Sequence, residues 1–270
     1  MTAGRRTRFL LLILLLQASL ALAMFSVYDP NCRASLWQGG PGGTKTPAAN
    51  YGTSAGFKVL KRFSFDGEEP LKDWEEKIFR KKTAYTVMRE AGRGFLNSAS
   101  AGASSGLYTK LNLEVSPDLL LSWRWRAIRF PRKKSPDRLS DSRQDDFAAR
   151  LYVIFPGSNF FNSHVIEYLW DEKVRAGKVE SSPFSNKVKL FVLRSGEPDR
   201  KEDWAEEERN IYDDYRRLFG EEPRRPLGAL AIMSDSDNTG TTSESDFSEI
   251  LIKTKDKTAA APAMITEPRA

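Results

Sequence analysis

Alternation of apolar and polar residues is the feature that most constrains the fold of this chain. In LLLSWRWRAI (119–128) and FAARLYVIF (147–155), every second side chain is apolar over most of the run. A period of two places successive side chains on opposite faces of a β-strand. The same signal marks nine segments, and polar or Pro/Gly-containing stretches separate nearly all of them: 57–65, 83–88, 106–115, 119–128, 147–155, 164–171, 187–195, 227–233 and 247–253.

Two further segments, 71–79 and 204–219, carry apolar residues at helical spacing. Gly220 follows the second segment and is a typical helix stop. Nine strands with two short helices predict an all-β domain, either a β-sandwich or a barrel. Long connections and a final strand that returns after a loop favour a jelly-roll β-sandwich.

The N-terminus predicts export. Arg5, Arg6 and Arg8 precede an apolar run over 9–23, which ends in Ala-Leu-Ala. This is the pattern of a cleaved signal peptide over 1–23, and the run is shorter than the roughly 20 residues that a membrane-spanning helix needs. We therefore expect a periplasmic or secreted protein with no stable membrane span after cleavage, and the alternative is an uncleaved signal anchor.

Composition divides the rest of the chain into three parts. Residues 24–56 are rich in Gly, Pro, Ala and Thr and predict a disordered lead-in, and 254–270 predict a disordered tail. The span 57–253 between them is long enough for one large domain. The formal charge of +6 falls to +3 without the three signal arginines, and basic and acidic residues are interspersed, which argues against nucleic acid as a partner. These patterns give no prediction of the oligomeric state.

Several motifs, in order along the chain, resemble one family. They are LSWRWR (121–126), DDFAARLYVIF (145–155), EYLWD (167–171), ERNIYDDYRRLFGEEP (208–223) and ALAIMSDSDNTG (229–240). Together they resemble DUF3047, a family of exported bacterial proteins that is catalogued as a domain of unknown function, and the resemblance covers about 63–252. The family's general outline is similar to the jelly-roll sandwiches of carbohydrate-binding modules, so the resemblance implies a galactose-binding-like fold. It implies no activity.

Strand parity predicts a ligand-binding face. If the strands 119–128, 145–155 and 164–171 are neighbours, one face gathers a set of cationic, acidic and aromatic side chains. The set is Arg124, Arg126, Asp146, Arg150, Tyr152, Tyr168 and Trp170. Aromatic rings stack on sugars, and a surplus of arginine suits an anionic ligand. The alternative is a half-solvated sheet on which these charges only neutralise one another.

The stretch MSDSDNTGTTSESDFSEILI (233–252) predicts either a calcium loop or a polar turn. Asp235, Asp237, Thr239, Gly240 and Asp246 occupy positions 1, 3, 5, 6 and 12 of a calcium-loop spacing. Thr at the fifth position, Asp at the twelfth and flanking strands depart from an EF-hand. Two alternatives therefore remain. Either Asp235, Asp237, Thr239 and Asp246 bind calcium, or the segment is a polar turn whose side chains cap their own backbone.

Three functions follow from these residues. The preferred hypothesis is a non-catalytic binding module for a glycan or another polar or anionic envelope ligand. The second is a polysaccharide hydrolase or lyase, in which Asp146 works with Asp235 or Asp237. The third is a scaffold that docks a partner protein through the same face.

Overall fold

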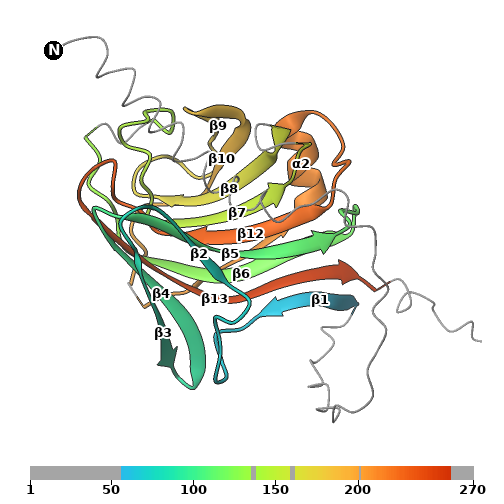
Figure 1. The fold of residues 1–270 in the computed structure, drawn as a ribbon, viewed down its shortest axis with the longest axis horizontal. Coiled ribbons are helices and arrows are strands. Elements are labelled where there is room, and N and C mark those ends of the chain that lie inside the picture. Colours follow the sequence, from blue (N-terminus) through green and yellow to red (C-terminus); the bar gives the residue numbers. More distant parts are fainter. Residues whose placement is uncertain (1–55, 135–137, 159–161, 201, 257–270) are drawn as a thin grey trace, which may run out of the picture.

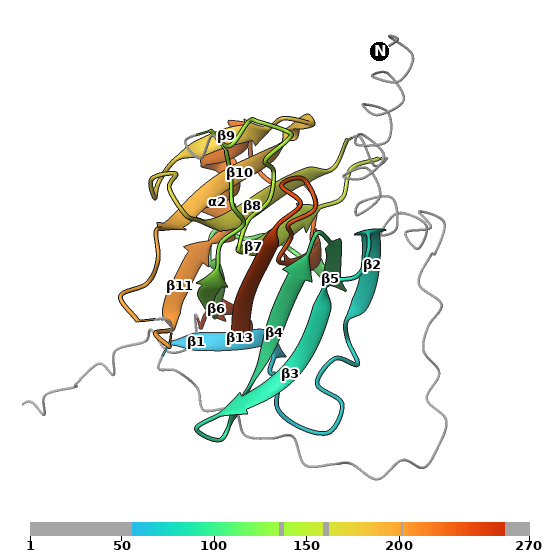
Figure 2. The same ribbon diagram turned by 90° about the vertical axis from the view of Figure 1, so that its left-hand side faces the viewer.

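The protein forms a sandwich of two open, mainly antiparallel β-sheets (Figures 1 and 2). The computed structural model describes residues 56–134, 138–158, 162–200 and 202–256. Sheet A has the order β11-β6-β13-β4-β3, with β1 also paired to β13; sheet B has the order β2-β5-β12-β7-β8-β10-β9. Both sheets have free edges, so the barrel alternative is excluded.

The strands of sheet A are β1 (Phe57–Phe63), β3 (Ala84–Glu90), β4 (Arg93–Ala101), β6 (Leu119–Arg129), β11 (Ala205–Asn210) and β13 (Thr242–Lys255). Those of sheet B are β2 (Glu75–Arg80), β5 (Ser104–Leu113), β7 (Ala149–Phe155), β8 (His164–Asp171), β9 (Val179–Ser182), β10 (Ser185–Ser195) and β12 (Leu227–Met233). The pair β8–β10 is parallel.

The core between the sheets is rich in aromatic side chains. Trp123 and Trp125 on β6 point inward because they share the parity of the leucines on that strand. Trp123 stacks on Tyr168 of β8, with ring centres 5.3 Å apart, and Trp125 lies 5.8 Å from Trp170. Offset and tilted ring pairs of this kind join the two layers.

Strand β13 is long because it serves two partners in succession. Its first half pairs with β4 and its second half pairs with β1, while β6 runs along its other edge. The register shifts between Ser248 and Leu251, and Glu249 in this gap has a positive φ of 47°. This irregularity is a β-bulge, which bends the strand and allows the change of partner.

The first predicted helix, 71–79, is wrong. The residues from 75 onwards form strand β2, which pairs with β5, and Trp74 precedes the strand and packs against Phe63 and Phe65. Three apolar residues at helical spacing are too few to decide the period. Strands β4 and β9 were not predicted from the sequence. The residues of β4 that face the interior include small polar ones, such as Ser98 and Ser100, so the apolar alternation of this strand is weak.

The second predicted helix, 204–219, is correct only in its second half. Residues 205–210 form β11, and helix α2 (Ile211–Phe219) follows directly. Asn210 caps the helix by accepting a hydrogen bond from the Asp213 backbone N–H, and Gly220 ends it with a φ of 73°. Helix α2 covers one end of the sandwich, where the Tyr215 ring lies 4.7 Å from that of Phe155.

The predicted signal 1–23, the lead-in as far as residue 55 and the tail from residue 257 lie outside the described residues. Strand β13 extends to Lys255, two residues into the predicted tail. Within the described ranges, no helix has both the length and the apolar character that crossing a membrane would require.

Candidate functional site

The seven residues predicted to line one ligand-binding face do not share a face. Arg124 and Arg126 lie on β6 in sheet A, whereas Arg150 and Tyr152 lie on β7 in sheet B. Strand β6 pairs with β11 and β13, and β7 pairs with β12 and β8. The parity within each strand was correct, but the assumption that β6 and β7 are neighbours was wrong.

Tyr168 and Trp170 point away from Arg150, into the core between the sheets. Tyr168 is fully buried, and its hydroxyl donates a hydrogen bond to Asp214 of helix α2 at 2.7 Å. Burial, followed by the nearby Asp214 carboxylate, raises the pKa of Tyr168 well above its usual range. The pairing of Tyr152 with Glu167 places Glu167 on the outer face of β8 instead. Tyr168 and Trp170 therefore connect the layers and have no access to a ligand on the surface.

Arg150 lies at the centre of a buried ionic cluster, which we call the Arg150 centre. Its Nη1 donates to Asp235 at 2.5 Å, and its Nη2 donates to Glu167 at 3.0 Å and to Asp145 at 3.3 Å. All four side chains are at most 3% exposed. The guanidinium also lies over the rings of Phe147 and Tyr152. Asp146 and Asp237 adjoin this group and complete the Arg150 centre.

Negative charge is in excess at the Arg150 centre. One buried guanidinium faces five carboxyl groups, and the outlying cations Arg80 and Lys133 lie at its edges. Burial is the main cause that raises the pKa values of Asp145, Asp235 and Asp237, and neighbouring carboxylates raise them further. Burial likewise raises the pKa of Glu167 to about 7. The cluster therefore favours extra protons or an added cation.

We predict that Glu167 makes folding stability depend on pH. Its pKa is raised in the folded protein, so the stabilisation that comes from protonated Glu167 is complete below its unfolded pKa and is lost as the pH rises towards about 7. Glu167→Gln should remove this loss, and the variant should gain on the parent by up to about 3 kcal/mol between pH 4.5 and pH 8. Urea unfolding at a series of pH values measures the difference, with Glu197→Gln as the control for losing one exposed carboxyl. A parent and a Glu167 variant with parallel pH profiles would contradict the prediction.

The loop between β12 and β13 is folded around Asp146. The Asp146 carboxylate accepts hydrogen bonds from the backbone N–H of Thr239 at 2.6 Å, and from the backbone N–H and side-chain amide of Asn238. Carboxylate oxygens of Asp146, Asp235 and Asp237 lie within 4.8 Å of one another. Asp146 comes from the segment before β7, so two distant parts of the chain meet here.

The predicted calcium ligands separate into two groups. Asp235 and Asp237 lie together, whereas Asp246 lies on sheet A, where it binds Arg126 at 2.6 Å and Asn97 at 2.8 Å. The Thr239 hydroxyl interacts with Ser236 and Thr241 inside the loop. The loop therefore does not wrap in the manner that the twelve-residue spacing requires, because its second half continues as strand β13.

A second cluster, on the outer face of sheet A, centres on the partly exposed ring of Trp204. We call it the Trp204 platform, and it comprises Trp204, Phe95, Arg124, Arg126, Glu90, Asn97 and Asp246. The guanidinium of Arg126 lies 4.4 Å from the centre of the Trp204 ring, and that of Arg124 lies 5.3 Å from it. The indole N–H donates to Glu90 at 2.9 Å. The ring is therefore held in a fixed position beside polar groups.

Strand pairing places the polar groups of the Trp204 platform in a row across sheet A. Asp246 on β13 is paired with Arg126 on one side and with Asn97 on the other, and Thr86 on β3 follows Asn97. Burial raises the pKa of Asp246, whereas the hydrogen bond from Trp204 lowers that of Glu90. Arg126 and Asp246 in this row are buried and bound to each other, whereas Asn97 is partly exposed.

The two arginines of the Trp204 platform are matched by carboxylates. Arg126 pairs with Asp246 at 2.6 Å and with Glu90 at 3.1 Å, and Arg124 lies 3.2 Å from Glu206. The sequence predicted a positive surplus near these arginines, because it did not place the acidic partners. The platform has no surplus of positive charge that would select an anion.

Sequence reasoning missed Trp204, Phe95 and Asn97. Trp204 was assigned to a helix, and the other two lie on β4, for which no strand was predicted. The residues AEEERN that follow Trp204 are mostly charged and show little apolar alternation, so their pairing with β6 could not be predicted from the sequence.

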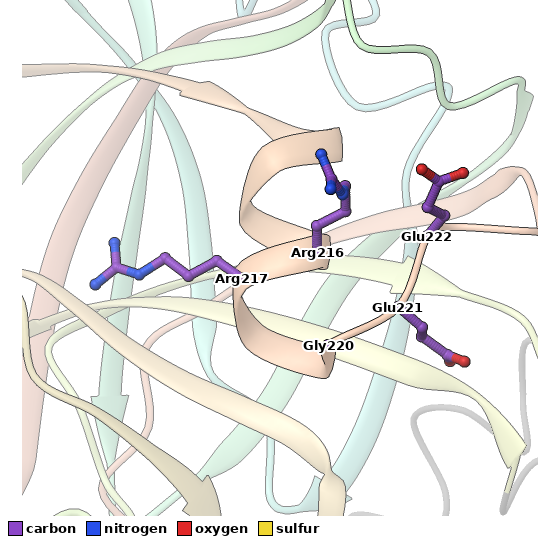
Figure 3. Close-up of a pocket in the computed structure, with 5 residues that line it drawn as sticks. All are labelled: Arg216, Arg217, Gly220, Glu221 and Glu222. Atoms are coloured by element: carbon purple, nitrogen blue, oxygen red, sulfur yellow. The ribbon is translucent and has the colours of Figure 1, made fainter.

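A surface depression at the end of helix α2 does not form a comparable site. It is lined by Arg216, Arg217, Gly220, Glu221 and Glu222. Figure 3 shows the two arginines pointing in different directions from the helix, with the glutamates on the turn that follows it. The charged groups do not converge on a common point, so we do not place a function there.

The family model for DUF3047, a protein family of unknown function, matches residues 72–251, which is well over half of the chain. The chain belongs to the DUF3047 family. The match includes both clusters of this DUF3047 protein, since Glu90, Arg150, Trp204 and Asp246 all lie within it. A comparison with curated proteins gave no match.

Solved structures similar to this DUF3047 protein are remote. The family 11 carbohydrate-binding module of the cellulosomal cellulase Lic26A-Cel5E of Clostridium thermocellum is 10% identical, with a TM-score of 0.38, over 74% of this chain and 95% of that one. The xyloglucanase domain of NopAA, a type three effector from Sinorhizobium fredii, is 11% identical, with a TM-score of 0.38, over 67% and 93%. A tandem CBM22 domain from Paenibacillus barcinonensis Xyn10C is 12% identical, with a TM-score of 0.37, over 80% and 49%. The functional argument therefore rests on the side chains of this chain alone.

Proposed function

We propose that this DUF3047 protein is a non-catalytic binding module that holds a neutral glycan on the Trp204 platform. It would act in the periplasm or outside the cell after removal of residues 1–23. The observation that carries the proposal is the partly exposed Trp204 ring, fixed by Glu90 and flanked by two guanidiniums on the open face of sheet A. Aromatic faces bind the C–H faces of sugars, and charge-assisted donors bind their hydroxyls.

The charge balance of the Trp204 platform favours a neutral ligand over an anionic one. Each arginine already has a carboxylate within 3.2 Å, so an anion would have to compete with Asp246, Glu90 or Glu206. Asp246 and Arg126 are buried, so the groups open to a ligand are Glu90, Glu206 and the partly exposed Arg124. A sugar hydroxyl can donate to these two carboxylates and accept from the Arg124 guanidinium at the same time. The sequence predicted either a glycan or an anion as the ligand. The charge balance of the platform favours a neutral ligand with several hydroxyl groups.

The jelly-roll, galactose-binding-like assignment is part of the same proposal. Strand β13 lies between β4 and β6, and β12 lies between β5 and β7, so strands from distant parts of the chain alternate within each sheet. Long-range insertion of this kind is typical of jelly rolls. The ligand would lie on the outer face of sheet A, beside the partly exposed Trp204.

A hydrolase or lyase based on the paired aspartates has weaker support. Asp146 is fully buried and holds the N–H groups of the β12–β13 loop, while Asp235 is held by Arg150 and by the Phe147 backbone N–H. Two catalytic carboxyls must flank a substrate in an open cleft. These aspartates are engaged in binding the protein itself.

Replacing Trp204 with alanine tests the binding proposal. We expect affinity for the best neutral oligosaccharide on a glycan array to fall at least about tenfold, because an aromatic anchor of a binding site is lost. Ile78→Ala is the matched control: this apolar residue lies on β2 in sheet B, is 44% exposed and is far from the platform in the strand order. Far-UV circular dichroism checks the fold of both variants.

Two results would contradict the proposal. One is the absence of binding by the parent protein to any neutral glycan on the array. The other is equal loss of affinity in the Ile78 and Trp204 variants. Binding confined to uronic-acid oligosaccharides, or to a partner protein, would assign the face to an anion or to a docking role in place of a neutral sugar.

A further inference from the structure

Three carboxylates from two segments of the chain converge at one edge of the Arg150 centre. Asp146 precedes β7, and Asp235 and Asp237 follow β12. Their oxygens lie within 4.8 Å of one another, and the residues are 0%, 2% and 9% exposed. Two ligands on opposite sides of a calcium ion, each at about 2.4 Å, are about 4.8 Å apart, so a cation fits between them without a large movement.

Within the described residues, Asp237 is the member of this trio with the weakest compensation, because its carboxylate is hydrogen-bonded only to its own backbone N–H. Asp146 accepts three hydrogen bonds from the loop, and Asp235 accepts them from Arg150 and from Phe147. Within the described residues, the Asp237 carboxylate accepts none from another residue, although its side chain is only 8% exposed. Its nearest cation, Arg80, is 4.0 Å away, beyond hydrogen-bond distance, on a side chain that is 58% exposed. A buried carboxylate that is compensated this weakly is stabilised by an added cation.

The surrounding charges also favour a cation over a hydrogen-bond donor from the protein. Among the described residues, Arg150 is the one cation that donates hydrogen bonds to the carboxylates of this cluster, and it is already shared among Asp145, Glu167 and Asp235. The Lys133 side chain is also buried, but it is bound to Asp171. The trio contributes two further carboxyl groups, Asp146 and Asp237, that Arg150 does not bind. A divalent ion would supply the missing positive charge at the point where the three carboxylates meet.

We propose that Asp146, Asp235 and Asp237 bind a calcium ion, which joins the segment before β7 to the loop between β12 and β13. The ligands are all oxygens, which select a hard cation, and the chain has one histidine and one cysteine, both outside the trio. Magnesium demands a stricter octahedron at about 2.0–2.1 Å and suits this wide set less well. Water molecules complete the coordination. This site is separate from the Trp204 platform and does not depend on the function proposed for it.

The position of the ion explains what it would do for the protein. Asp146 holds the backbone of Asn238 and Thr239, and Asp235 holds the backbone of Phe147, so each segment already contacts a carboxylate from the other. A cation between these carboxylates removes their mutual repulsion and stabilises both loops. We infer a structural role, in which calcium raises the stability of the sandwich.

The test measures thermal unfolding of the mature chain after dialysis against a chelator. At a calcium concentration about 100-fold above the dissociation constant, we expect the melting temperature to rise by about 5–10 °C. Asp237→Asn removes the charge of this weakly compensated carboxylate while keeping the shape of the side chain, and the rise should disappear in this variant. Calorimetric titration with calcium chloride should show one site in the parent and none in the variant.

Asp246→Asn is the control that separates this trio from the twelve-residue loop spacing. Asp246 lies on sheet A, bound to Arg126, so its variant should keep the full calcium-dependent rise. No rise in the parent, or an equal rise in the Asp237 variant, would overturn the proposal. Loss of the rise in the Asp246 variant would also contradict the three-carboxylate site and would favour a calcium loop with the twelve-residue spacing. A larger rise with magnesium than with calcium at equal concentration would overturn the choice of ion.

Discussion

Replacing Arg150 with methionine will lower the free energy of unfolding by about 3–5 kcal/mol at pH 8. The side chain is 2% exposed and binds Asp145, Glu167 and Asp235. Methionine preserves much of the apolar stem but leaves these carboxylates buried without a counter-ion, which is the costly outcome of breaking a buried ion pair. Urea unfolding followed by tryptophan fluorescence measures the loss.

The pH dependence of this loss distinguishes charge from packing. Without Arg150, the pKa values of the buried carboxyls rise further, so their protonated forms stabilise the variant at low pH and this stabilisation is lost as the pH rises. The difference between parent and variant should therefore be smaller at pH 5 than at pH 8. Arg143→Met is the matched control, because Arg143 is 86% exposed and pairs with Asp141 at the surface; we expect its cost to be much smaller and nearly independent of pH. A loss for Arg150→Met that is equal at both pH values would show that packing, not charge, dominates.

Replacing Trp123 with alanine should cost about 3–5 kcal/mol. Trp123 is 1% exposed and contacts rings in both layers: Tyr168 of sheet B at 5.3 Å and Trp125 of its own sheet at 5.4 Å. The substitution leaves a cavity between the sheets and removes the ring stacking, and the packed neighbours can fill only part of that space. Equilibrium unfolding in urea gives the value.

Trp204→Ala provides the comparison for this second prediction. Trp204 also contacts three large side chains, Phe95, Arg124 and Arg126, but it lies at the surface, and we expect its loss to lower stability much less than the loss of Trp123. We expect the reverse order for glycan binding: Trp204→Ala should lose more affinity than a Trp123 variant that remains folded, such as Trp123→Phe. If the two alanine variants were equally unstable, the assignment of one tryptophan to the core and the other to the binding face would fail.

The long strands were predictable because the alternation of side chains between the two faces of a strand is a local pattern. In β6, β7 and β8 a period of two separates the two faces of each strand, and the inward position of Trp123 and Trp125 follows from the leucines beside them. Strands β4 and β11 were missed because their inward or paired residues are small or charged, so the hydrophobic pattern is weak there. The helix at 71–79 was wrong for a related reason, since a few apolar residues fit more than one period.

The candidate sites were less predictable, because they depend on which strands are neighbours. Arg126 and Arg150 each point away from the apolar face of their own strand, so the sequence patterns around them are alike. In the structure Arg126 pairs with Asp246 on sheet A, whereas Arg150 pairs with Glu167 and Asp235 at sheet B. Asp235 and Asp237 were selected by their spacing, but their partner Asp146 is almost ninety positions earlier in the chain. No local pattern carries such a pairing.

The amino-acid sequence by itself determined the class of the fold, the faces of the main strands and the family to which the chain belongs. These properties depend on side chains within one strand, where the pleat fixes which residues point the same way. The tertiary structure alone decided that Arg124 and Arg126 meet Trp204, that Arg150 is enclosed by carboxyls, and that Asp146 joins Asp235 and Asp237. Contacts between distant segments follow from the order of strands in the two sheets, which the packing of the whole core selects.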